Sequence, residues 1–318
     1  MLALCAFELP QAFRERVTQQ EAHDAYHLPN AKFLGPAALR APKPLTGVSK
    51  VTMLRGIKVV VKRIGDPDPR DDLYEGPFEP ERAYKLFKNE ATNHLQAYVH
   101  LSPSCREFLS TPACMDLNRT KLVGTYPYTV QTFLDLPGHQ LVSAQHFFER
   151  HTGPSSTSLL PANFTAATKR TMLKSLCEAF GRMVACTYQS GILHQDFHAD
   201  NVHLLVPYQW PQPGHTDIKW RVIDWGNSDP LDSTVPLELC VAEDKREHSP
   251  ETNRALWMYG VMGVNAQGER VCRNVRYAVV TLMRRAMRHI VPEALVVGWV
   301  NEAIKEALLE RVYEGNEK

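Results

Sequence analysis

Residues 191–206 carry the side chains best suited to chemistry in this chain. His194, Asp196, His198 and Asn201 follow a strongly helical stretch and precede a short apolar run typical of a strand. Their segment is therefore expected to be a loop held by a rigid scaffold, a common setting for functional side chains. Carboxylate and amide oxygens are also the ligands that Mg²⁺ prefers. The alternative is that these polar residues only cap a loop.

A second acidic residue follows the next predicted strand. Asp224-Trp225-Gly226 comes directly after the apolar run 220–223. His194 and Asp196 are two positions apart, and Asn201 follows Asp196 by five. This order, H-x-D-x-x-x-x-N and then D-x-G after a strand pair, resembles the catalytic core of the protein-kinase-like superfamily.

The resemblance implies a role for each residue. Asn201 and Asp224 would bind Mg²⁺, which neutralises charge on a triphosphate. Asp196 would orient or deprotonate the attacking hydroxyl, and His194 would brace the loop. His198 gives the pattern D-x-H-x-x-N, which resembles aminoglycoside and choline phosphotransferases and several atypical kinases. This histidine favours a small-molecule acceptor over a protein.

Upstream, the run Val59-Val60-Val61-Lys62 resembles the kinase strand whose lysine holds the α- and β-phosphates. A helix is predicted to follow from Pro80, with apolar residues at helical spacing. Two of its acidic residues, Glu90 and Glu81, are candidates for the ion pair with Lys62. The helical phase alone does not choose between them.

Two further segments are expected to meet the nucleotide. Thr132, Phe133 and Leu134 resemble the end of the last N-lobe strand and the hinge that contacts adenine through its backbone. No G-x-G-x-x-G precedes Lys62. The candidate phosphate loop is residues 45–51, in which Gly47 and Ser49 could present backbone amides to a phosphate.

The order of predicted elements gives the fold class. We expect an α+β, bilobal protein-kinase-like fold, with an N-terminal extension (1–45), an N-lobe made of a small antiparallel sheet and one helix (46–133), and a mainly helical C-lobe (134–318). The extension should be irregular, with room for one short helix. The predicted elements are strands at 50–54, 57–61, 121–124, 128–134, 202–206 and 220–223, and helices at 80–98, 165–190, 271–290 and 293–313.

Composition bounds the remaining possibilities. The 318 residues include 36 Lys and Arg against 35 Asp and Glu, a net charge of +1 that argues against a nucleic-acid or membrane-surface protein. The seven cysteines are scattered without a C-x-x-C pair, so we expect neither a disulfide framework nor a zinc ribbon, and a reducing compartment. No apolar run of about 20 residues is present. These features predict a cytoplasmic protein.

The function predicted from the sequence is an ATP- and Mg²⁺-dependent kinase. It would move the γ-phosphoryl group of ATP to a hydroxyl of a small molecule or, alternatively, of a protein Ser or Thr. A pseudokinase or nucleotide-binding scaffold is a second possibility, and an interaction protein without a nucleotide site is a third. Metal binding by His194, His198 and His203 is a competing interpretation of the loop.

Several arginines crowd the predicted helix 271–290 and its approach. A solvated helix face explains them, and a patch for phosphate, nucleic acid or an acidic partner is the alternative. The residues are Arg270, Arg273, Arg276, Arg284, Arg285 and Arg288.

Overall fold

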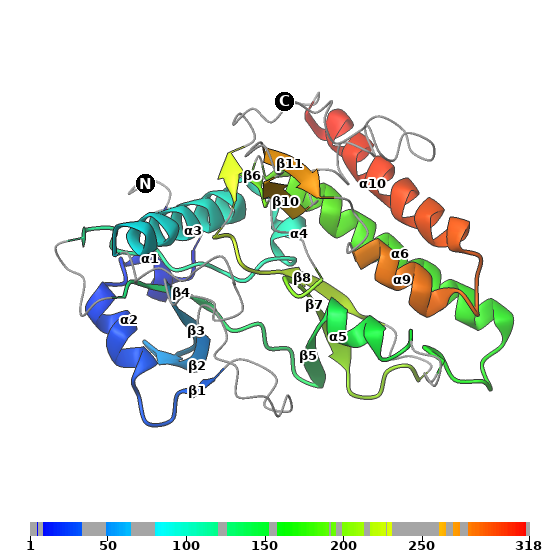
Figure 1. Ribbon diagram of the computed structural model, residues 1–318, viewed down its shortest axis with the longest axis horizontal. Coiled ribbons are helices and arrows are strands. Elements are labelled where there is room, and N and C mark those ends of the chain that lie inside the picture. Colours follow the sequence, from blue (N-terminus) through cyan, green and yellow to red (C-terminus); the bar gives the residue numbers. More distant parts are fainter. Residues whose placement is uncertain are drawn as a thin grey trace. The chain divides into compact units, whose positions relative to one another are not determined.

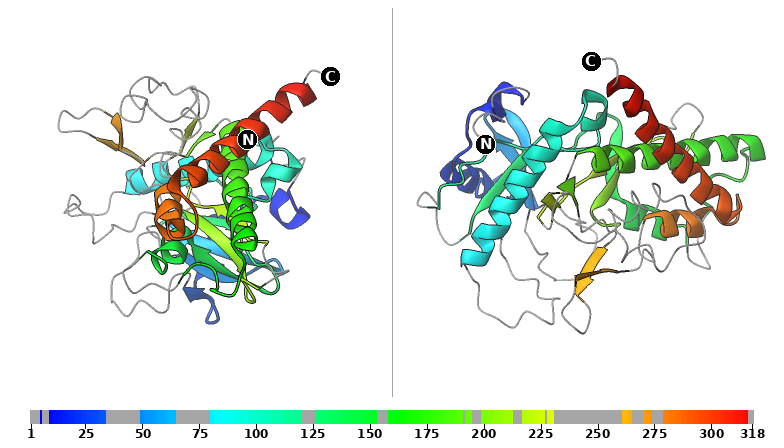
Figure 2. Two further views of the ribbon diagram at one scale, coloured as in Figure 1. Left: turned by 90° about the vertical axis from the view of Figure 1, so that its right-hand side faces the viewer. Right: turned by 90° about the horizontal axis from the view of Figure 1, so that it is seen from above.

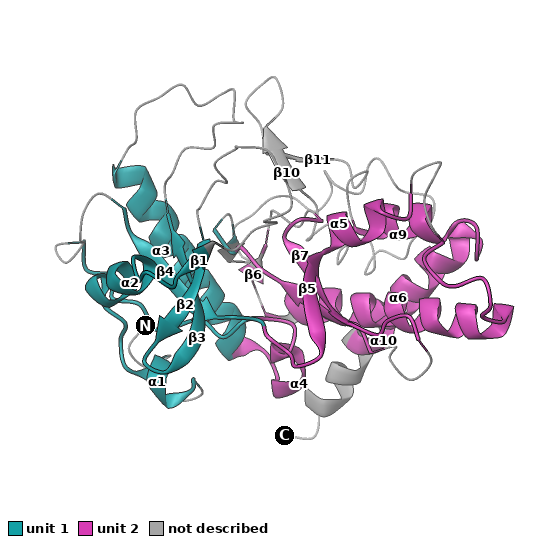
Figure 3. Cartoon of the chain, turned by 90° about the horizontal axis from the view of Figure 1, so that it is seen from below, with its two compact units in different colours: residues 1–99, 110–134, 225–228 teal, residues 100–109, 135–224, 229–318 magenta. Residues whose placement is uncertain are grey.

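The computed structural model of the chain forms two compact units, which Figure 3 distinguishes by colour. Unit 1 is residues 1–99, 110–134 and 225–228, and unit 2 is residues 100–109, 135–224 and 229–318. The main break follows Leu134, one residue beyond the boundary expected from the sequence. The residues that the structure describes are 5, 9–33, 49–64, 80–119, 126–152, 158–190, 192–194, 199–212, 217–226, 228–230, 261–264, 270–273 and 279–315.

Unit 1 is built on a four-stranded antiparallel sheet (Figure 1). Its strands, in spatial order, are β1 (Lys32–Phe33), β2 (Ser49–Leu54), β3 (Ile57–Arg63) and β4 (Tyr128–Thr132). The predicted hairpin at β2 and β3 is confirmed. Arg55 and Gly56 both have positive φ, 50° and 77°, as the twist-matched two-residue hairpin loop requires. The predicted strand 121–124 lies outside the described residues.

A long helix packs with this sheet. α3 (Pro80–His100) begins at a proline, whose missing amide hydrogen is not needed in the first helical turn. Phe87, Ala91 and Leu95 lie on one face at helical spacing and join the same buried cluster as Val59 and Val61 of β3. The helix predicted from the apolar spacing is therefore present.

The described residues of the N-terminal segment belong to unit 1, which corrects the expectation of an irregular extension. α1 (Gln11–Arg14) and α2 (Gln19–Tyr26) both form, and α2 packs against β2, β3 and β4. The buried side chain of Gln19 bonds the backbone N–H and C=O of Tyr128, at 2.7 and 3.0 Å. The physical reason is that Phe13, Val17 and Ala22 supply apolar surface to the core of the unit.

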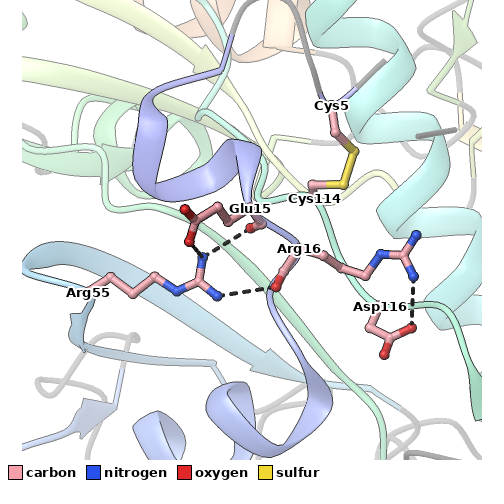
Figure 4. The surroundings of a disulfide bond; sticks show 6 residues. All are labelled: Cys5, Glu15, Arg16, Arg55, Cys114 and Asp116. Carbon is pink, nitrogen blue, oxygen red and sulfur yellow. Dashed lines mark hydrogen bonds and ion pairs between the residues drawn. A yellow bond between two sulfur atoms is a disulfide. The ribbon is translucent and has the colours of Figure 1, made fainter. Parts of the chain in front are cut away.

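Two further contacts fasten this segment, as Figure 4 shows. The Arg55 guanidinium, at the hairpin turn, donates to the backbone oxygens of Glu15 and Arg16 at 3.0 and 3.2 Å. It also donates to the Ala12 carbonyl, which the figure does not draw, at 2.9 Å. A disulfide joins Cys5 to Cys114, with a Cα–Cα distance of 5.8 Å.

A second disulfide lies in unit 2. Cys105 of α4 (Pro103–Arg106) is joined to Cys186 of α6 (Ala166–Gln189), with a Cα–Cα distance of 5.4 Å. The expectation that the chain has no disulfide framework was therefore wrong. The partners are 109 and 81 residues apart, so only the tertiary fold brings them together. A reducing compartment was expected because no disulfide framework was expected, so that expectation has lost its basis.

Unit 2 is mainly helical. α6 begins after Thr165, whose Oγ1 accepts a hydrogen bond from the Thr168 amide at 3.1 Å, the predicted N-cap. α10 (Glu293–Gly315) packs along α6 (Figure 2), with α9 (Val279–Met287) against α10. Gly181 permits the close approach, because a Cβ there would lie 2.5 Å from the Val300 carbonyl oxygen.

A small antiparallel sheet carries the loop of interest in unit 2. Its order is β5 (His139–Ser143), β7 (Val202–Pro207) and β8 (Lys219–Val222), and α5 (Ala144–Glu149) follows β5 directly. The two strands predicted near 202–206 and 220–223 are confirmed. Two strand pairs complete the elements of the described residues: β6 (Ile192–Leu193) with β9 (Asp229–Pro230), and β10 (Val261–Val264) with β11 (Arg270–Arg273).

The predicted helix 271–290 was partly wrong. Its first residues form β11, because Val261–Val264 supplies a partner strand that outweighs the helical spacing. The helix itself, α9, covers only 279–287. Arg270 and Arg273 therefore do not share a helix with Arg284, which forms an ion pair with Glu293 at 2.8 Å.

The α+β class is confirmed in both units. Unit 1 has the predicted hairpin, long helix and further strand, and unit 2 is mainly helical, as expected of a protein-kinase-like chain. Within the described residues, no helix is both long enough and apolar enough to span a bilayer.

Candidate functional site

Lys62 and Glu90 form a shielded ion pair within unit 1. The Lys62 ammonium lies 3.0 Å from the Glu90 carboxylate, and their side chains are 17% and 8% exposed. Glu81 instead pairs with Arg119 at 2.6 Å, and its side chain is 78% exposed. Glu81 and Glu90 are nine residues apart, or 2.5 helical turns, so they lie on opposite sides of α3. Of the two candidate partners of Lys62 that the sequence left open, the structure selects Glu90.

The candidate phosphate loop connects neighbouring strands. β1 pairs with β2, so residues 34–48, which include Gly47 and lie outside the described residues, join two adjacent antiparallel strands. Ser49 begins β2 and is directly opposite Lys62 in the β2–β3 register. Opposed residues in such a pair share a face of the sheet, so Ser49 and Lys62 lie on the same side. The sequence did not predict β1, a strand of only two residues.

The expected hinge has backbone groups that are already bonded. The Thr132 amide donates to the Thr111 carbonyl at 2.8 Å, and the Phe133 amide donates to the Lys58 carbonyl at 3.1 Å. The Lys58 ammonium also lies 4.2 Å from the centre of the Phe133 ring. Leu134 is the last residue of its segment in unit 1. The amides of Thr132 and Phe133 are therefore bonded within unit 1, and the adenine contacts expected of residues 132–134 stay a prediction.

In unit 2, the backbone of Ile223 connects His194 and Asn201 with the segment that leads to Asp224. Its carbonyl accepts a hydrogen bond from Nε2 of His194 at 2.8 Å, and its amide donates to the Asn201 carbonyl at 3.0 Å. His194 is fully buried, and a carbonyl can only accept, so Nε2 carries the proton. The Gln145 amide, donating to the Ala199 carbonyl at 3.1 Å, holds the loop from α5. His194 therefore braces the segment that leads into Asp224.

Asn201 and Asp224 lie at the same end of the β7–β8 pair. Val202 is paired with Val222, so Asn201 precedes β7 where Asp224 follows β8. Asp224 has φ 62°, a left-handed conformation that is uncommon for a residue other than glycine and that clusters at functional sites. Two such oxygen-bearing side chains suit Mg²⁺, which usually takes one or two protein ligands beside substrate phosphates.

Two of the predicted catalytic residues cannot be placed. Asp196 and His198 belong to residues 195–198, outside the described residues. For the described part of the chain, no cluster of three or more His, Cys, Asp or Glu side chains is arranged to hold a metal ion. The described His194 and His203 therefore give no support to a histidine metal site.

Sequence reasoning missed a set of polar contacts on α3. The Asn93 side-chain amide donates to the Ser228 carbonyl at 2.5 Å, and Nε2 of His94 donates to the Ser110 carbonyl at 2.8 Å. The His94 ring stacks on the buried Trp225, with ring centres 5.9 Å apart and planes at 11°. These contacts hold the residues just after Asp224 to the helix that carries Glu90. In the sequence, the available signal was two polar residues, Asn93 and His94, three and four positions after Glu90 and so on the same side of the helix.

The sequence named His203 only as a candidate ligand in the alternative interpretation, a histidine metal site. It lies on β7, opposite Ser143 on one side and Arg221 on the other. Burial lowers the pKa of His203 to about 4, so the ring is neutral near pH 7. Its Nδ1 is buried without a hydrogen-bond partner among the described residues.

Comparison with known proteins leaves the family open. No protein-family model matches the chain, and no curated protein matches it either. Among solved structures, it is similar to the crystal structure of the BubR1 kinase domain at 14% identity and a TM-score of 0.40, covering 88% of this chain and 86% of that one. It is also similar to WaaP in complex with acyl carrier protein, at 12% identity and a TM-score of 0.37, covering 91% of each chain. Neither similarity is close enough to assign a role to a residue of this chain.

Proposed function

We propose that the chain is an ATP- and Mg²⁺-dependent phosphotransferase that moves the γ-phosphoryl group of ATP to a hydroxyl acceptor. The observation that carries this proposal is the shielded ion pair between Lys62 and Glu90. A lysine whose ammonium is held by a helix-borne carboxylate is oriented before any ligand arrives. It can then contact phosphate oxygens without first losing conformational freedom.

Unit 2 carries further groups that suit this chemistry. Asn201 and Asp224 would hold Mg²⁺, and the bound metal would neutralise charge on the transferring phosphoryl group. His194 keeps the Ile223 backbone in place between them. Asp196 would orient or deprotonate the acceptor hydroxyl, and His198 favours a small molecule over a protein Ser or Thr as the acceptor.

A nucleotide-binding scaffold without turnover is the second candidate function. It is favoured by the lack of a G-x-G-x-x-G before Lys62. Both candidates predict binding of Mg·ATP, and they differ in whether phosphate is transferred.

Transfer of labelled γ-phosphate separates the two. Purified protein is incubated with Mg²⁺ and labelled ATP, in parallel with generic proteins and with a pool of hydroxyl metabolites. A phosphotransferase labels one acceptor class, and Asp196→Asn lowers the single-turnover rate by about 10²–10⁴ while leaving Mg·ATP affinity nearly unchanged. Binding without labelling of any acceptor supports the scaffold. Full activity of Asp196→Asn contradicts the assigned role of the loop.

A further inference from the structure

The outer edge of β8 is bonded to the segment that follows α4. β8 is the last strand of the β5–β7–β8 sheet, and residues 108–109 lie along its other edge. The Val222 amide donates to the Phe108 carbonyl at 2.9 Å, and Leu109 forms a parallel bridge with Val222. Val222 is fully buried and lies two residues before Asp224. The segment therefore holds the end of the strand that leads to a proposed metal ligand.

The α4 turn has little local stability of its own. It is a helix of four residues, too short to be stable without tertiary contacts. Ser102, its N-cap, makes no side-chain capping bond with a described residue, and Pro103 and Ser104 are exposed. The disulfide from Cys105 to Cys186 is therefore the covalent anchor of this turn in unit 2.

α6 gives this anchor a firm base. α10 packs along α6, and the close approach at Gly181 is only five residues before Cys186. At the other end of the anchor, Phe108 follows Cys105 by three residues and bonds Val222. The path from the disulfide to β8 is therefore one helical turn and one hydrogen bond.

The backbone of Asp224 depends on such support. Its φ of 62° is uncommon for a residue other than glycine, and a conformation of this kind persists only where the surrounding structure imposes it. If β8 loses its outer neighbour, Asp224 can relax to an ordinary backbone conformation. Its carboxylate then no longer lies where the metal would need it.

We propose that the Cys105–Cys186 disulfide is a redox switch that sets the position of Asp224 and, through it, the affinity for Mg·ATP. This inference rests on the proposed function, in which Asp224 holds Mg²⁺. In the oxidised form, α4 stays on α6 and residues 108–109 stay on β8. In the reduced form, α4 is free to leave, and the metal-binding conformation is populated for a smaller fraction of the time. The apparent affinity falls with that fraction.

The reductant that this switch requires is a dithiol. Cys105 and Cys186 are 6% and 7% exposed, so a thiolate reaches a sulfur when α4 opens, and a single turn can open without unfolding the rest of the unit. One thiolate attacks a sulfur of the pair to form a mixed disulfide, and the second thiol of the reductant then displaces it. The pair gains two electrons and two protons and ends as two thiols, while the dithiol ends as its own disulfide.

Paired variants separate this disulfide from the other one. Cys5→Ser/Cys114→Ser keeps the Cys105–Cys186 cross-link, and the matched control Cys105→Ser/Cys186→Ser keeps the cross-link in unit 1. Dithiothreitol is the dithiol, and alkylation followed by mass spectrometry reports which cysteines have been reduced.

Two measurements follow the switch, and the first needs no nucleotide. On reduction of Cys5→Ser/Cys114→Ser, hydrogen exchange at the Val222 amide should become at least about tenfold faster, at labelling times at which the amides of α6 are still protected. Calorimetry should show Mg·ATP binding weakened about three- to tenfold, and reoxidation should restore it. In Cys105→Ser/Cys186→Ser, both values should already be those of the reduced form and should not respond to dithiothreitol.

The results distinguish failure of this inference from failure of the proposed function. The switch is refuted if Cys105 and Cys186 stay oxidised in the folded protein, or if they are reduced and exchange at Val222 does not change. Loss of protection throughout α6 on reduction would refute it too, because the disulfide would then be a purely structural cross-link. If exchange responds and Mg·ATP affinity does not, the switch is overturned and the proposed function stands. If neither form binds ATP in Mg²⁺, the proposed function fails, and control of affinity fails with it.

Discussion

Removing the charge of Lys62 should destabilise unit 1 through the partner that it leaves behind. In Lys62→Met, the Glu90 carboxylate stays on α3, where its side chain is only 8% exposed. In Glu90→Gln, by contrast, the remaining charge is on Lys62, which is twice as exposed and long enough to turn its ammonium toward water. The two single variants should therefore differ in stability, and Lys62→Met should be less stable than Glu90→Gln.

The magnitude follows from the separation and the burial. At 3.0 Å, the attraction between the charges is roughly 5 kcal/mol for an effective dielectric constant of about 20, before the loss of hydration is subtracted. Breaking a buried pair from one side typically costs about 3–5 kcal/mol. We expect a loss in this range for Lys62→Met and about 1–3 kcal/mol for Glu90→Gln. The double variant should recover about 2 kcal/mol relative to the sum of the single losses.

Urea unfolding at pH 7, with a double-mutant cycle, measures these values. Lys58→Met is the matched control: Lys58 is exposed on the same strand, and its contact with the Phe133 ring is worth about 1 kcal/mol or less. Additive losses in the cycle would refute the reasoning, because independent sites add. A Lys62→Met variant as stable as the wild type would refute it as well.

Three further predictions concern parts of the chain away from the ion pair. Replacing Cys105 and Cys186 together by serine should lower the free energy of unfolding by up to roughly 4–5 kcal/mol, from the entropy of the 81-residue separation, and a change below 1 kcal/mol in urea would count against that cross-link. Burial raises the pKa of the Cys177 thiol, so mass spectrometry should find Cys177 unmodified by iodoacetamide at pH 8 until the protein is unfolded; rapid native labelling would contradict its burial. Thr18→Ala removes one half of the capping box with Glu21 and should cost about 1 kcal/mol in thermal unfolding, whereas an unchanged melting temperature would mean that α2 does not depend on its cap.

The elements with local signals could be predicted from the sequence. The Arg55-Gly56 turn lies between two β-rich runs, and those runs form β2 and β3. α6 begins where Thr165 can cap it, and α3 begins where Pro80 fits a first turn. In each case the residues that decide the structure are neighbours in the sequence, so no tertiary contact had to be known.

The features that depend on distant partners could not be predicted. Helical spacing predicted a helix where β11 forms, because the spacing carries no information on the pairing of this segment with β10. The cysteine pairs span 81 and 109 positions, and spacing alone does not reveal such cross-links.

The candidate site divides in the same way. Motif spacing nominated Lys62, Asn201 and Asp224, whose roles stay predictions. It could not choose Glu90 over Glu81 as the partner of Lys62, because that choice needed the turn of α3 relative to β3. The bonded amides at Thr132 and Phe133 were also beyond the sequence, because their acceptors, Thr111 and Lys58, lie elsewhere in the chain.

Metal-dependent binding of ATP distinguishes a Mg·ATP phosphotransferase from a chain without a nucleotide site. Titration calorimetry compares ATP binding in Mg²⁺ and in EDTA, for the wild type and for Asp224→Asn. We expect the wild type to bind ATP in Mg²⁺ and to lose most of this affinity in EDTA. Asp224→Asn should bind ATP more weakly and with less dependence on the metal. Equal ATP affinity in Mg²⁺ and EDTA, or no ATP binding by a correctly folded wild type, would contradict this expectation.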